Sequence, residues 1–100
     1  MARDPYSYRE LLVHAAPEPM TGRLRIRPLP GQAFATSLRV QCARKLLEGY
    51  PVGTVFKVNA KMTDREGGEP FLYVWHGDPV EVLDAAEAEK YLQAYRRLRI

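Results

Sequence analysis

The sequence predicts a small α+β domain in which helices cover an antiparallel sheet. Apolar and polar residues alternate near residues 23–27 and 54–62, which is the period of a half-buried strand. Near residues 37–48 and 84–97, apolar residues instead recur at helical spacing. The expected order of elements, α-β-α-β-β-β-α, is typical of the α+β class.

Length and composition fit one globular domain. A chain of 100 residues with 46% hydrophobic and 27% charged residues is long enough for a modest core and too apolar for disorder. No apolar run approaches the roughly 20 residues that span a membrane, and the N-terminus lacks the apolar run of a secretory signal. Cys42 is the single cysteine, which excludes an intrachain disulfide and a cysteine-based metal site. We therefore expect a cytoplasmic protein without a cofactor.

The first element is expected to be a short helix near residues 6–15. The capping box Ser7-x-x-Glu10 is a helix-start signal, apolar residues then recur at helical spacing, and Pro17 ends the pattern. A proline-rich linker follows. Within a single domain covering the whole chain, residues 1–20 are therefore a candidate N-terminal appendage and linker.

The segment 23–27 alternates strictly between basic and apolar residues. Leu24 and Ile26 would face the core, and three arginines would form a ladder of like charge on the other face. Pro28 lacks a backbone donor, which is tolerated at a sheet edge. An edge strand of this kind also permits self-association by strand pairing.

A central helix is expected near residues 37–48. Thr36 or Ser37 is the candidate N-cap, and Gly49 stands where a helix often ends in a left-handed residue. The apolar residues between them fill one arc of a helical projection, with Arg39 as the exception inside that arc. Arg39 would reach solvent past the helix end or contact a partner.

A β-meander and a last helix follow. The segment 54–62 alternates, a glycine-containing turn follows, and the segment 70–76 returns as a strand. A third strand is expected near 80–83, and a second capping box opens the final helix near 84–97.

The register of this hairpin decides what its aromatic residues do. Both faces of the segment 70–76 are apolar. If Lys61 lies opposite Tyr73, then Phe71, Tyr73 and Trp75 share the outer surface with lysines, as a platform on which bases stack. If the register differs by one residue, these aromatics pack inside, which we favour because a small core needs its large side chains. A sheet covered by helices on both faces is the third arrangement.

Charge is segregated along the chain. Eight basic residues stand between Thr21 and Lys61 against the acid Glu48, a net charge of +7. Eight acids stand between Asp64 and Glu89 against one arginine, a net charge of −7. The two segments either neutralise each other across neighbouring elements or leave a basic surface for an anionic partner.

Enzyme signatures are nearly absent. The sequence contains no P-loop, no dinucleotide-binding glycine motif and no zinc-protease motif. His76-Gly77-Asp78 offers a base beside an orienting carboxylate, but these residues before Pro79 are more typical of a turn. We therefore expect no catalysis.

The leading hypothesis is a small non-catalytic protein that binds nucleic acid, single- or double-stranded, or another polyanion. The alternative is a protein-interaction module, such as a regulator, inhibitor or accessory subunit, that docks through an edge strand or its acidic C-terminal half. A homodimer through the edge strand is also open, and no membrane partner is expected. The candidate phosphate contacts are Arg23, Arg25, Arg27, Arg44, Lys45, Lys57 and Lys61, with Tyr73 and Trp75 as stacking groups.

Overall fold

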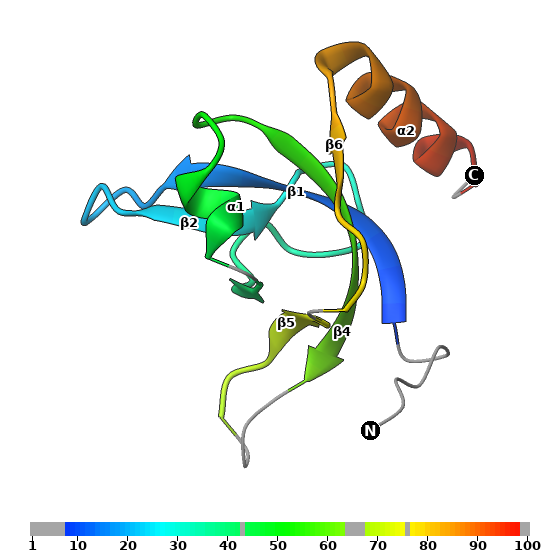
Figure 1. Cartoon of the computed structure of the whole chain (residues 1–100). Coiled ribbons are helices and arrows are strands. Elements are labelled where there is room, and N and C mark those ends of the chain that lie inside the picture. The colour runs from blue at the N-terminus through cyan, green and yellow to red at the C-terminus, as the bar shows by residue number, and fades with distance from the viewer. Residues whose placement is uncertain (1–7, 43, 64–67, 76, 99–100) are drawn as a thin grey trace.

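Strands dominate the structure. The computed structural model describes residues 8–42, 44–63, 68–75 and 77–98. Figure 1 shows the elements in chain order: β1 (Tyr8–Pro17), β2 (Leu24–Pro28), β3 (Val40–Gln41), α1 (Lys45–Glu48), β4 (Val55–Thr63), β5 (Phe71–Val74), β6 (Glu81–Leu83) and α2 (Ala85–Leu98).

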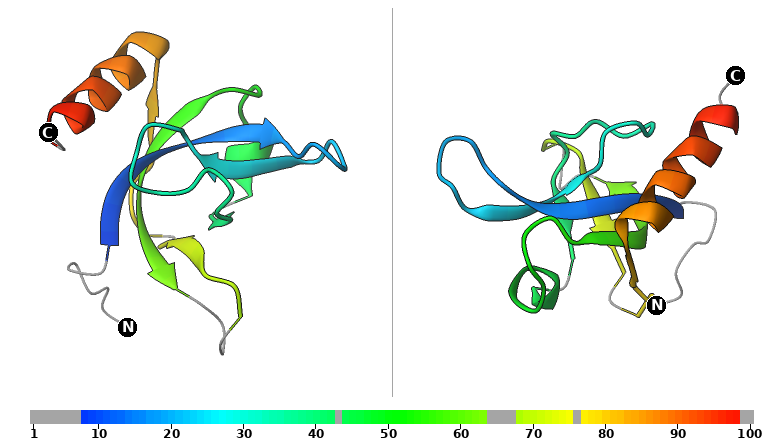
Figure 2. Two further views of the ribbon diagram at one scale, coloured as in Figure 1. Left: turned by 180° about the vertical axis from the view of Figure 1, so that it is seen from behind. Right: turned by 90° about the horizontal axis from the view of Figure 1, so that it is seen from above.

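The strands form one sheet that curls into a nearly closed barrel (Figures 1 and 2). Their order is β2-β1-β4-β5-β3, and β6 pairs with the first residues of β4. All pairs are antiparallel except β3 with β5, which run parallel. The two ends of the order, β2 and β3, approach each other. An open seam between β2 and β3 therefore interrupts the barrel.

The predicted fold class, a sheet covered by helices, is wrong. From Tyr8 onward, the segment predicted as a helix near 6–15 is instead β1, while residues 6 and 7 lie outside the described residues. Part of the candidate appendage 1–20 thus supplies the strand between β2 and β4. Leu11 and Leu12 are both buried, because the inner face of β1 lines the barrel and α2 covers its outer face at Leu12. A strand buried on both faces gives adjacent apolar residues, which imitates helical spacing.

The central helix predicted near 37–48 is also wrong for most of its length. Of the residues of this segment that the structure describes, Lys45–Glu48 are helical, and Val40–Gln41 forms β3. Leu38, Val40 and Cys42 all pack against the barrel core, so every second residue points inward, as in a strand. The backbone N–H of Leu72 donates to the carbonyl of Arg39 at 2.8 Å and ties this segment to β5.

The remaining predicted strands and the last helix are present. β2, β4, β5 and β6 cover most of the expected segments. The capping box of α2 forms as predicted, since Glu87 N–H donates to Asp84 Oδ1 at 2.8 Å and Asp84 N–H donates to Glu87 Oε1 at 3.0 Å.

The hairpin register places Lys61 opposite Tyr73. The prediction that the aromatics of β5 pack in the core is therefore wrong. Leu72 and Val74 point inward instead and are buried. Helices do not cover both faces of the sheet either, because α2 packs on the outer face only around Leu12 and Leu83.

Two apolar clusters hold the fold together. The larger fills the barrel, with Phe56 and Val58 of β4 at its centre, each at most 1% exposed. The smaller lies outside the barrel, where Leu12 and Leu83 contact Ala88 of α2. Burying a side chain of Leu or Phe contributes about 1.5–3 kcal/mol, so these clusters supply most of the driving force for this arrangement.

The side chain of Gln32 takes the place of a strand beside β1. Its Oε1 accepts from the backbone N–H of Leu12 at 2.7 Å, and its Nε2 donates to the carbonyl oxygens of Leu12 at 2.9 Å and Leu29 at 3.0 Å. β2 pairs with β1 only as far as Pro28, opposite Val13. The amide of Gln32 thus satisfies the backbone N–H of Leu12 just beyond the end of β2, whereas the carbonyl of Leu12 also accepts from the backbone N–H of Leu29 at 3.1 Å.

Replacing Gln32 by leucine tests this contact. The variant leaves the N–H of Leu12 without its acceptor at a buried position, so we expect Gln32→Leu to lower the free energy of unfolding by about 1–3 kcal/mol. Urea denaturation followed by circular dichroism measures the loss. Gln93→Leu on the exposed face of α2 is the matched control, and equal stability of the two variants would contradict the role of Gln32.

Candidate nucleic-acid interface

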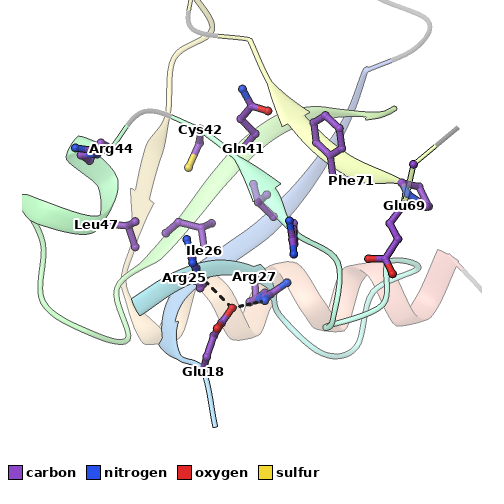
Figure 3. Close-up of a pocket in the computed structure, with 14 residues that line it drawn as sticks. Glu18, Arg25, Ile26, Arg27, Gln41, Cys42, Arg44, Leu47, Glu69 and Phe71 are labelled. Atoms are coloured by element: carbon purple, nitrogen blue, oxygen red, sulfur yellow. Dashed lines mark hydrogen bonds and ion pairs between the residues drawn. The ribbon is translucent and has the colours of Figure 1, made fainter. Parts of the chain in front are cut away.

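A groove of about 720 Å³ lies over the open seam between β2 and β3 (Figure 3). It is built from β2, β3, α1 and the loops before β2 and β5. Its lining residues are Glu18, Arg25, Ile26, Arg27, Arg39, Val40, Gln41, Cys42, Arg44, Leu47, Gly68, Glu69, Pro70 and Phe71.

Strand alternation sends the arginines into this groove. Ile26 points into the barrel and is 4% exposed, so Arg25 and Arg27 on either side of it face outward. Arg39 faces outward next to the half-buried Val40. Arg44 lies just before α1 and is exposed. Four arginines from three parts of the chain therefore share one groove with two glutamates.

Glu18 neutralises part of this charge. Its Oε1 accepts from Arg27 Nη2 at 2.8 Å and lies 3.3 Å from Arg25 Nε, and Figure 3 shows both arginines directed at it. Desolvation opposes ionisation of Glu18, but the hydrogen bond from Arg27 and the charge of Arg25 outweigh it and lower the pKa of the carboxyl. Glu18 therefore stays ionised at neutral pH.

Arg27 is held from two directions. Besides its bond to Glu18, its Nη1 donates to the carbonyl oxygen of Ser37 at 2.8 Å. Glu18 follows β1 and Ser37 precedes β3, so the guanidinium of Arg27 bridges the seam. A fixed guanidinium loses little conformational entropy when it binds an anion.

Arg39 and Arg44 carry charge that the described chain does not compensate. Their guanidinium groups form no ion pair or side-chain hydrogen bond within residues 8–42, 44–63, 68–75 and 77–98. Both residues are exposed. The groove therefore presents two unpaired cations beside the partly neutralised pair on β2, which favours an anionic ligand.

Cys42 lines the same groove but is not set up as a nucleophile. Burial raises the pKa of its thiol to about 11, so the reactive thiolate is scarce at neutral pH. No group of three metal-ligating side chains occurs among the residues that the structure describes. The groove is therefore suited to binding through charge.

The lysines of β4 lie elsewhere. Lys57 and Lys61 are on the outer face of the barrel, because Phe56, Val58 and Ala60 occupy the inner face. Lys57 Nζ forms an ion pair with Glu81 at 2.8 Å, and the hydrogen bond to that carboxylate raises the pKa of Lys57. Lys57 is thus engaged within the protein.

The predicted contact residues lie in different parts of the structure. Arg25, Arg27 and Arg44 meet in the groove, whereas Arg23 is exposed in the turn before β2 and does not line it. Lys61 and Tyr73 share the outer face of the sheet with Lys57, and Trp75 follows the last residue of β5. The side chain of Lys45 and the whole of His76 lie outside the described residues.

Several groove residues were not among the predicted phosphate and stacking contacts, namely Arg39, Gln41, Phe71 and the acids Glu18 and Glu69. Arg39 had a signal in the sequence. Leu38, Val40 and Cys42 alternate at strand spacing, and this spacing places Arg39 and Gln41 on the opposite, outer face. No sequence pattern pointed to Glu18 and Glu69, because they lie in loops that reach the seam only in the folded chain.

Trp75 is positioned by a glycine two residues later. A Cβ atom on Gly77 would overlap the six-membered ring of Trp75. The indole therefore packs directly on the backbone of Gly77, and only glycine leaves room for it. This contact fixes the place of the half-buried ring just after β5.

Comparison with protein-family models, curated proteins and solved structures found no match to this chain. Of the helices in the described residues, none has the length and apolar character needed to cross a membrane.

Gly77→Ala tests the packing of Trp75. The added methyl group would displace the indole, and we expect a shift in the emission maximum of Trp75, the single tryptophan of the chain. Fluorescence spectroscopy of the folded variant measures it. Gly22→Ala is the control, because a Cβ there has no neighbour within 4 Å and only strains a residue at φ 71°. An unchanged emission spectrum in Gly77→Ala would contradict the contact.

Proposed function

We propose that this chain is a small non-catalytic nucleic-acid-binding protein that contacts phosphates in the groove at the seam of the barrel. The observation that carries the proposal is the pair of uncompensated arginines, Arg39 and Arg44, beside Arg25 and Arg27. Guanidinium groups bind phosphate oxygens through paired, charge-assisted hydrogen bonds. Several such contacts give an affinity that depends strongly on salt.

The connectivity of the barrel supports the proposal by analogy. The strand order β2-β1-β4-β5-β3, one parallel pair and a short helix between β3 and β4 resemble the connectivity of OB-type barrels. Those are five-stranded, partly open Greek-key barrels whose second and third strands bind oligonucleotides and oligosaccharides. A shared architecture does not by itself assign a function, so the arginines remain the main support.

A protein-interaction module is the second candidate. β2 and β3 end the pairing order, so each has an edge that no described strand covers. Such an edge is able to pair with a strand of a partner or of a second copy of the chain. This candidate predicts weak binding to nucleic acid and no steep dependence on salt.

For the compartment, we propose the cytoplasm. Cys42, the single cysteine, is partly buried as a free thiol, which suits a reducing environment.

The double variant Arg39→Gln/Arg44→Gln tests phosphate binding. Removing two contacts should weaken binding of a labelled oligonucleotide and lower the slope of log affinity against log salt concentration by about 1.4 for a single strand or 1.8 for a duplex. Fluorescence anisotropy between roughly 50 and 200 mM salt measures both.

Lys90→Gln is the matched control, because it removes an exposed positive charge from α2, outside the groove. We expect a salt slope close to that of the unmodified chain. Absence of binding by the unmodified chain at low salt would overturn the proposal and favour the protein-interaction module.

Glu18→Gln is expected to strengthen binding. The carboxylate of Glu18 occupies Arg25 and Arg27 and repels phosphate, so its neutralisation should raise affinity several-fold at low salt and less at high salt. Lowering the pH through the depressed pKa of Glu18 should protonate this carboxyl and likewise raise the affinity. Anisotropy titrations measure the change, with Glu89→Gln on α2 as the control of equal charge. Equal affinity of these two variants would contradict competition by Glu18.

A further inference from the structure

A row of side chains crosses the outer face of the barrel at one level. Gln41 of β3 lies opposite Tyr73 of β5, Tyr73 opposite Lys61 of β4, and Lys61 opposite Tyr8 of β1. We call these four residues the outer row. They face outward because the next residues along β5, Leu72 and Val74, point into the core.

The outer row begins where the groove ends. Gln41 belongs to both, since it lines the groove and is level with Tyr73. Phe71 also lines the groove and lies on the same face of β5 as Tyr73, two residues away. Figure 3 shows Gln41 and Phe71 on adjacent strands at the upper edge of the groove. The surface is therefore continuous from the arginines to Tyr73.

Charge along the outer face favours an anion at Lys61. Lys61 forms no ion pair within the described residues, in contrast to Lys57, which pairs with Glu81. Glu10 stands opposite Asn59, one step nearer to α2. Glu10 and Glu81 thus lie toward α2, and Lys61 stands between Tyr8 and Tyr73, nearer to the groove.

The helix α2 leaves the outer row open. It packs on Leu12 and Leu83 and reaches β1 through Tyr91, whose hydroxyl donates to the carbonyl oxygen of Glu10 at 3.4 Å. Figure 1 shows α2 beside β6, at the other end of β4 from β5. Tyr73 and Lys61 are half-buried, which limits their freedom before a ligand arrives.

We propose that the outer row continues the groove as a track for single-stranded nucleic acid. This inference rests on the proposed function of the groove. Bases would stack on Tyr73 and on Trp75, which follows β5 two residues later, while a phosphate contacts Lys61. The row spans three inter-strand spacings, roughly 14 Å. In a duplex the bases stack on each other and do not reach these rings.

The test compares Tyr73→Leu with Tyr73→Phe. Leucine keeps an apolar stem but removes the stacking ring, whereas phenylalanine keeps the ring and removes only the hydroxyl. For a labelled single strand of about sixteen nucleotides, we expect Tyr73→Leu to weaken binding about tenfold and Tyr73→Phe to leave it nearly unchanged. Affinity for the duplex of the same sequence should not change in either variant.

Two further readouts keep the test independent of folding defects in Tyr73→Leu. Lys61→Gln should lower the salt slope for the single strand by about 0.7 and leave the slope for the duplex unchanged. Emission of Trp75 should be quenched by the single strand and not by the duplex, because stacked bases would contact the indole.

The outcomes separate the track from the groove. If Tyr73→Leu and Lys61→Gln bind the single strand as tightly as the unmodified chain while Arg39→Gln/Arg44→Gln binds weakly, the track is wrong and the groove stands. The track would also be overturned if the chain bound the single strand and the duplex with equal affinity and Tyr73→Leu changed neither affinity. If the unmodified chain binds neither oligonucleotide, the proposed function fails and the track fails with it.

Discussion

The fold depends on β1, which is hydrogen-bonded to a neighbouring strand along each of its edges. It pairs with β2 on one side and β4 on the other. Its residues are buried on both faces, with Leu11 and Val13 inside the barrel and Leu12 beneath α2. The pairing with β2 ends at Pro28, and the amide of Gln32 then satisfies the backbone of Leu12. Losing β1 would separate β2 from β4 and remove the surface around Leu12 on which α2 packs.

The seam follows from the same pairing. Because β1 directs β2 to one end of the sheet and β5 holds β3 at the other, these two short strands meet at the incomplete closure. Their inward residues, such as Ile26 and Val40, contact the barrel core, so their outward residues have to line the surface above the seam. Arg25 and Arg39 occupy such positions. Strand alternation therefore concentrates positive charge where the backbone is least covered.

Sequence patterns predicted the elements that are buried on one face only. The predicted alternation of inward and outward residues is present in β2, β4 and β5, and the predicted capping box of Asp84 also forms. The first predicted helix was wrong because β1 is buried on both faces. The central one was wrong because β3 and α1 are short and close in sequence, so their apolar residues together imitate one helical pattern. To predict the groove from the sequence, one would have to know which strands meet at the seam. No local pattern carries this information, since Glu18 and Arg44 are distant in sequence.

The charge segregation of the sequence is only partly resolved inside the protein. Between the described residues of the basic segment 21–61 and those of the acidic segment 64–89, the ion pair is that of Lys57 with Glu81. Glu18, which neutralises Arg25 and Arg27, stands before the basic segment. The acids of β6 and α2 lie on the side of the sheet that carries Leu12 and Leu83, whereas Arg39 and Arg44 lie at the seam. The acidic segment therefore neutralises the charge of Lys57 but leaves the seam positive. A positive field of this kind attracts an anionic partner before any contact forms.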